Sequence, residues 1–268
     1  MPGAITQPTL FIPHGGGPCF FMEWNPPNTW KKMGEFLSNL RVTLPAMPAA
    51  VVVISGHWET PDFSVAANPH PPLIYDYSGF PPHTYQLTYP APGGPALAGK
   101  IRDLLQSAGF PAQTDPERGF DHGVFIPFKL VYPDADVPIV QLSLRNGLDP
   151  ATHIAVGRAL EPLRSQGVLI VGSGMSYHNL RGFGDSFSQE SDEFDAWLTA
   201  AATAPDPAKR EELLKHWAQA PHARLAHPRE EHLLPLMVAA GAAGTDTGRR
   251  VFSDRVMGVT VSAFQFGG

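Results

Sequence analysis

Three histidines follow apolar runs of the kind that form buried strands. The runs cover residues 10–13, 51–56 and 168–174, and they precede His14, His57 and, three residues further on, His178. In an open α/β sheet, ligands bind at the carboxyl ends of the strands. Imidazole is the commonest side-chain metal ligand and the usual proton shuttle near neutral pH. The sequence therefore predicts a metal centre at one edge of a sheet.

Apolar runs alternate with helix-like segments along the chain. The strand candidates are 9–13, 49–55, 63–67, 137–144, 167–172 and 255–265. The helix candidates are 28–40 with Asn28 as its cap, 95–108, 150–166, 186–203, 207–219 and 229–243. This alternation predicts an α/β fold. We expect one domain over residues 1–268, with a largely parallel or mixed central sheet flanked by helices on both faces.

Composition and charge narrow the range of partners. The net charge of −6 argues against nucleic acid or an anionic membrane surface as the main partner. The longest apolar stretches, 49–54 and 233–243, are shorter than the roughly 18–20 residues that span a bilayer. Residues 1–7 do not resemble a signal peptide, and the single Cys19 provides neither a disulfide nor a thiolate metal cage. We expect a cytoplasmic protein, and no pattern indicates its oligomeric state.

The common catalytic signatures are absent from the sequence. It contains no G-x-S-x-G nucleophile elbow, no P-loop and no complete dinucleotide fingerprint. His232 does not open an H-E-x-x-H motif, because position 236 is leucine. A serine hydrolase, a nucleotide-binding enzyme and a zincin protease are therefore not indicated.

Two further histidines lie near predicted helix starts. His122 follows Asp121, which is expected to cap a helix and leave His122 exposed; alternatively His122 is an acid or hydrogen-bond donor beside the site. Glu230 and Glu231 precede His232. Their charges either interact favourably with the dipole of the predicted helix or belong to a set of metal ligands. The remaining candidates for surface or packing positions are His70, His83, His153, His216 and His222.

A set of motifs resembles one known family. The motifs are HGGGP at 14–18, SGHW at 55–58, GFDHG at 119–123, HNL at 178–180 and EHLLP at 231–235. In this order they resemble the class III extradiol ring-cleavage dioxygenases, specifically the DOPA 4,5-dioxygenase branch. Further matching stretches at 76–80, 89–93 and 132–138 extend the resemblance over nearly the whole chain.

The resemblance implies a non-haem Fe(II) site that opens a catechol ring next to its hydroxyls with O₂. It implies that His14, His57 and His232 are metal ligands, that His178 is the catalytic acid/base and that His122 lies near bound O₂. The expected substrate is L-DOPA or a related phenolic acid such as caffeate. Arg145 is a candidate partner for a substrate carboxylate. The proline-rich segment 68–94 is a candidate active-site loop, whose aromatic side chains could wall the ring.

The ligand set departs from the general facial triad of two histidines and one carboxylate. A three-histidine set lowers the negative charge at the metal and makes Zn(II) more competitive. With His178 as a fourth ligand, the site would suit tetrahedral zinc. Glu231 is an alternative ligand to His232. The other functions considered are a zinc-dependent hydrolase with Glu230 or Glu231 as base, and a non-catalytic binding protein.

Overall fold

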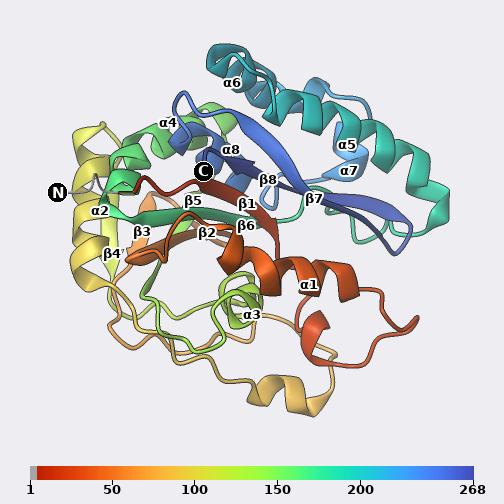
Figure 1. Cartoon of the computed structure of the whole chain (residues 1–268), viewed down its shortest axis with the longest axis horizontal. Coiled ribbons are helices and arrows are strands. Elements are labelled where there is room, and N and C mark those ends of the chain that lie inside the picture. The colour runs from red at the N-terminus through yellow and green to blue at the C-terminus, as the bar shows by residue number, and fades with distance from the viewer. Residues whose placement is uncertain (1–4) are drawn as a thin grey trace.

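The computed structural model describes residues 5–268, which form one mixed sheet with helices on both faces (Figure 1). The strands are β1 Thr9–Pro13, β2 Ala50–Thr60, β3 Phe63–Ala66, β4 Ala112–Asp115, β5 Ile139–Arg145, β6 Val168–Gly174, β7 Gly248–Val256 and β8 Val259–Phe266. The helices are α1 Lys31–Leu40, α2 Pro95–Ser107, α3 His122–Val131, α4 Pro150–Leu160, α5 Ser188–Ala202, α6 Pro207–Lys215, α7 Ala223–Ala226 and α8 Leu234–Ala242. The expected α/β class is confirmed. Residues 1–4, part of the segment expected to lack a signal peptide, lie outside the described residues.

The four central strands of the sheet are parallel, and the strands that flank them on either side are antiparallel to them. The strand order is β4-β3-β5-β2-β6-β1-β8-β7. Neighbours among β5, β2, β6 and β1 pair in parallel, whereas β3 is antiparallel to β5 and β8 is antiparallel to β1. The four central strands therefore bring their carboxyl ends to the same edge. Their near-continuous apolar sequences are explained by burial on both faces.

Two layers of helices provide that burial. In Figure 1, α4 and α8 lie above the central strands and α1 and α3 lie below them. Helix α8 contacts β6, β1 and β2, and α3 contacts β2 and β6 from the other side. Helix α5 packs on β8, and α6 packs on α5. Within residues 5–268, no helix combines the length and apolarity needed to cross a membrane.

The expected single strand at 255–265 is wrong, because this segment belongs to a hairpin. β7 and β8 pair in antiparallel across Met257 and Gly258, which both have positive φ angles, 46° and 86°. Two such residues form the two-residue turn that suits the twist of a hairpin. β7 was missed because it is a mostly polar, partly exposed edge strand without a buried apolar run.

Other element boundaries also differ from expectation. Helix α1 begins at Lys31, and Asn28 has a φ angle of 68° and does not cap it. Helix α8 begins at Leu234 rather than 229, so His232 lies in the turn before it. The four-residue β4 was not predicted, because its sequence AQTD has no apolar pattern.

Two glycines of β6 let the turn before α8 approach the sheet closely. A Cβ atom on Gly174 would collide with the carbonyl oxygen of His232, and one on Gly172 would collide with that of Pro235. The backbone amide of Met175 also donates to the carbonyl of His232 at 3.1 Å. His232 is thereby held against the carboxyl end of the central strand.

Gly174→Ala should destabilise the fold, because the added methyl group has no space against the His232 backbone. We expect a loss of about 1–3 kcal/mol in the free energy of unfolding, measured by urea denaturation of metal-free protein. The control is Gly99→Ala in α2, where nothing lies within 4 Å of the added Cβ; there we expect a gain of roughly 0.5–1 kcal/mol. Equal stability of Gly174→Ala and wild type would contradict this packing argument.

Candidate metal centre

Three imidazoles converge at the carboxyl edge of the central strands. His14 follows β1, His57 lies where the pairing of β2 with β5 shifts register, and His232 precedes α8. The Nε2 atom of His57 is 3.2 Å from that of His14 and 3.1 Å from that of His232. The structure thus brings together the three residues for which the resemblance implied a ligand role.

The outer nitrogen of each ring faces an oxygen that can accept its proton. Ser173 Oγ donates to the carbonyl of Gly123, so it accepts from His14 Nδ1 at 3.1 Å. The Nδ1 atom of His232 is 2.9 Å from Glu231 Oε1.

The Nδ1 atom of the third ring, His57, lies 3.4 Å from Asp76 Oδ2. With a proton on each Nδ1, all three Nε2 atoms present lone pairs to one another.

This donor set fits a divalent cation. A metal about 2.1 Å from each nitrogen places the nitrogens about 3.0 Å apart at right angles and about 3.4 Å apart in a tetrahedron. The observed separations of 3.1–3.2 Å lie between these values. Burial, reinforced by the neighbouring histidines, lowers the pKa of His14 and His232 and lowers that of His57 to about 4. The rings are therefore neutral at pH 7, as metal ligands must be.

His122 and His178 lie next to this cluster, and each packs against a different one of its three rings. The ring centroid of His122 is 3.9 Å from that of His57. The ring of His178 stacks on that of His232, with centroids 3.4 Å apart and planes inclined by 18°. His122 is buried, which contradicts the reading of it as an exposed residue after a helix cap. All five histidines of the resemblance thus gather at one site.

Two carboxylates each contact one ring of the converging trio and one of its neighbours. Asp76 Oδ1 accepts from His122 Nδ1 at 2.8 Å, and its other oxygen faces His57. Glu231 Oε1 lies near the Nδ1 atoms of both His232 and His178, at 2.9 and 3.3 Å. Asp76 was not predicted, because a carboxylate in a separate loop carries no sequence signal of its contacts.

The expected capping role of Asp121 is wrong. Its side chain makes no capping hydrogen bond to α3. It is fully buried and accepts from Ser55 Oγ at 2.8 Å, from Arg118 at 2.7 Å and from Gln141. Since Ser55 Oγ in turn accepts from the backbone amide of His57 at 3.2 Å, Asp121 supports the segment that carries this histidine.

Glu231 is fixed by a neighbouring arginine. Arg229 binds both carboxylate oxygens of Glu59, at 2.5 and 2.6 Å, and lies 3.4 Å from Glu231 Oε2. Burial alone would raise the pKa of Glu231, but the hydrogen bond from His178 and the charges of His178 and Arg229 outweigh it and lower the pKa. Glu231 is therefore ionised, and its Oε1 atom faces the outer nitrogens of the two rings.

The 68–94 loop places aromatic rings beside the cluster. The Tyr77 ring lies 5.8 Å from that of His122, and its hydroxyl donates to the carbonyl of Thr84 at 2.6 Å. The Tyr75 hydroxyl donates to the carbonyl of Leu87, also at 2.6 Å. These hydrogen bonds within the loop hold the rings in place and leave the tyrosine hydroxyls occupied.

Arg145 does not join the site. Its guanidinium lies 3.8 Å from Asp62 and donates to the carbonyl of Pro61 at 3.4 Å. Among the other histidines, His153 is buried in the packing, and His70, His83, His216 and His222 lie at or near the surface. The structure gives none of these residues a contact with the five clustered rings.

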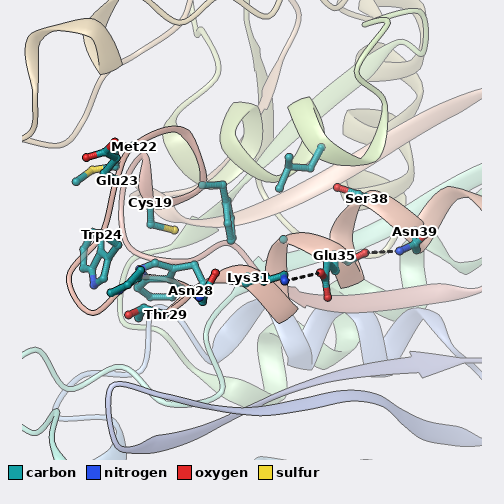
Figure 2. A pocket seen from close by; sticks show the side chains of 15 residues that line it. Cys19, Met22, Glu23, Trp24, Asn28, Thr29, Lys31, Glu35, Ser38 and Asn39 are labelled. Atoms are coloured by element: carbon teal, nitrogen blue, oxygen red, sulfur yellow. Dashed lines mark hydrogen bonds and ion pairs between the residues drawn. The ribbon is translucent and has the colours of Figure 1, made fainter.

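A cleft lies beside the turn that follows His14. It has a volume of about 780 Å³ and is lined by Leu130 and by residues that lie between Cys19 and Asn39, with no histidine among them. Figure 2 shows Cys19 and Trp24 toward one end and Ser38 and Asn39 toward the other. A Cβ atom on Gly15 would meet Cys19 Sγ and one on Gly16 would meet the Trp30 ring, so this turn packs against two of the residues that line the cleft.

Comparisons with known proteins agree with this geometry. Residues 8–265 match the family model for the catalytic LigB subunit of aromatic ring-opening dioxygenase. A 4,5-DOPA dioxygenase extradiol from Beta vulgaris is 42% identical over 244 residues, covering 89% of this chain and 88% of the relative. Its counterpart from Escherichia coli K12 is 39% identical, covering 88% and 85%.

A solved structure also matches over almost the full chain. The crystal structure of an uncharacterized protein from Escherichia coli K12 superposes with a TM-score of 0.77 at 33% identity, covering 97% of this chain and all of that one. The family match, the relatives and the common fold lead to one conclusion. This chain belongs to the LigB family of extradiol ring-opening dioxygenases.

Proposed function

We propose that this protein is an Fe(II)-dependent dioxygenase that uses O₂ to open the ring of a substituted catechol, with L-DOPA or a related phenolic acid as substrate. The observation that carries the proposal is the convergence of the His14, His57 and His232 Nε2 atoms. The names of the relatives from Beta vulgaris and Escherichia coli support the substrate class.

The three converging histidines would hold the metal. Three protein donors would leave a bound Fe(II) ion able to take further ligands, as a reaction between a catechol and O₂ requires. Bound Fe(II) would supply the redox chemistry that allows the ring and O₂ to react. The protein residues around it then have to orient the ring and transfer protons.

His178 is suited to proton transfer. Its Nδ1 atom lies 3.3 Å from ionised Glu231, which favours a proton on Nδ1 and leaves Nε2 as an acceptor. Its side chain is 21% exposed, whereas that of His232 beneath it is 5% exposed. A substrate can therefore reach His178, which would take a proton from a catechol hydroxyl and return it as the ring opens.

His122 and the 68–94 loop would complete the site on the other side. We assign His122 the position nearest O₂, because it lies against His57 and away from the stacked His178–His232 pair. Tyr77 presents its ring edge-on to His122, so a planar aromatic substrate would meet an apolar wall there.

The zinc hydrolase hypothesis is less well supported by the geometry. It needs Glu230 or Glu231 as a free general base. Glu230 accepts from Arg224 at 2.6 Å, and Glu231 faces two imidazoles and Arg229. Zn(II) fits the same three nitrogens, and we propose that it would occupy the site without supporting ring opening.

Anaerobic loading with Fe(II), addition of L-DOPA and admission of air should give a yellow ring-opened product with matching O₂ uptake. His57→Ala should lose the metal, because it removes the central donor of the cluster. His178→Ala should retain the metal but lose roughly 10²–10⁴-fold in kcat, the range typical of a lost acid/base.

His216→Ala is the control. His216 is exposed, contacts Glu212 and is not one of the five clustered histidines, so this variant should behave as wild type. The proposal fails if Fe(II)-loaded protein consumes no O₂ with L-DOPA, caffeate or unsubstituted catechol.

Replacing Fe(II) with Zn(II) should abolish turnover. The Zn(II)-loaded protein should nevertheless have a higher Tm than the metal-free protein, since both ions would use the same donors. Metal content and Tm are measured on the same samples. Equal ring-opening rates with Zn(II) and Fe(II) would exclude a redox role for the metal. Ester or amide hydrolysis by the zinc form would favour the hydrolase instead.

A further inference from the structure

Asp76 occupies an unusual place between the aromatic loop and the histidine cluster. It stands between Tyr75 and Tyr77 in the sequence, yet its carboxylate points to His57 and His122. One ring nitrogen from each of these two histidines and one carboxylate oxygen of Asp76 all lie within 4.8 Å of one another. The three side chains are therefore tightly packed. A single carboxylate therefore contacts a candidate metal ligand and a candidate catalytic residue.

We propose that Asp76 is a positioning residue that sets the tautomers of His57 and His122 and ties the aromatic loop to them. The proposal rests on the metal-binding role of His57 and the catalytic role of His122 proposed above. Neither the family match nor the relatives' names assign a role to Asp76.

The contact with His122 involves both its ring and its backbone. Asp76 Oδ1 accepts from the His122 ring Nδ1 at 2.8 Å and from its backbone amide at 2.9 Å. His122 is the first residue of α3, whose initial amides have no partner within the helix, and Asp121 does not cap them. Asp76 thus performs from a distant loop the capping that was expected of Asp121, and it fixes the direction of the imidazole.

The contact with His57 favours the same Nδ1–H tautomer in the second ring. Asp76 Oδ2 lies 3.4 Å from His57 Nδ1, while Nε2 of the same ring faces His14 and His232. An ionised carboxylate beside Nδ1 favours the proton there, so Nε2 keeps the lone pair that a metal needs. Burial alone would raise the pKa of Asp76, but the hydrogen bonds from the ring and the backbone amide of His122, with the electrostatic effect of the two imidazoles, outweigh burial and lower the pKa.

The loop is rigid enough to transmit this constraint. Tyr77 is braced to Thr84, and its ring contacts those of Phe80 and His122 at centroid distances of 5.6 and 5.8 Å. A shift of Asp76 would therefore move the aromatic wall and the two imidazoles together.

Asp76→Asn tests this assignment, because it keeps the shape and one acceptor oxygen. The amide nitrogen would face either His57 Nδ1 or the two donors of His122, so one ring must lose its acceptor. We expect Zn(II) affinity, measured by competition with a chelator in the absence of substrate, to fall about 10–100-fold. We also expect kcat at saturating Fe(II) to fall more than KM rises.

The matched control is Asp62→Asn, which alters a half-exposed carboxylate paired with Arg145 and should leave Zn(II) affinity unchanged. A second readout needs no variant: ¹⁵N NMR of histidine-labelled, metal-free wild type should show protons on Nδ1 of both His57 and His122. In Asp76→Asn, at least one of these two rings should change to the Nε2–H tautomer.

Wild-type rings that carry their protons on Nε2 would overturn the proposal. So would Asp76→Asn protein that binds Zn(II) as tightly as Asp62→Asn. Both measurements are independent of the reaction, so they stand even if no catechol is turned over. Wild-type protein with the expected tautomers and metal affinity but without ring opening would instead count against the proposed function alone.

Discussion

The site depends on one electrostatic constraint, which is that three imidazole nitrogens face one another in a buried space. The Nε2 atom of His57 is 3.2 Å from that of His14 and 3.1 Å from that of His232, so lone pair meets lone pair unless a cation lies among them. Burial lowers the pKa of each ring and so keeps the ring neutral at pH 7. A neutral imidazole is the state that a metal ligand requires. The contacts around the site hold these three rings close together despite the repulsion between their lone pairs.

The fold meets this constraint by using segments distant in the sequence. The parallel pairing of β1, β6 and β2 places the His14 and His57 segments on either side of β6. The same central strand supplies Ser173, which accepts from His14, and the glycine surface on which the His232 turn rests. A sheet with no room for a Cβ at Gly174 is a more rigid support than a loop, because the backbone contact leaves little freedom for the turn to shift.

The sequence was sufficient to predict the parallel centre of the sheet and the histidines at its edge, because buried strands have continuous apolar runs. It was insufficient for β7, whose polar side chains follow from an exposed edge position. It also missed Asp76 and misassigned Asp121, since a carboxylate directly before a helix looks the same in the sequence whether it caps that helix or contacts another segment. Local patterns report periodicity and turn chemistry, whereas the outer contacts of the site are made between loops whose relative positions only the packed fold determines.

Those outer contacts bear on the choice of three histidines over two histidines and a carboxylate. A neutral donor set leaves the charge of a bound cation uncompensated at its first contacts. Asp76 and Glu231 place two ionised carboxylates directly behind His57 and His232, where a carboxylate beside Nδ1 makes each ring a more basic donor. The negative charge is thus moved one layer outward and is not lost from the site. Since each carboxylate also contacts His122 or His178, the same charge that would stabilise the metal orients the groups proposed to transfer protons.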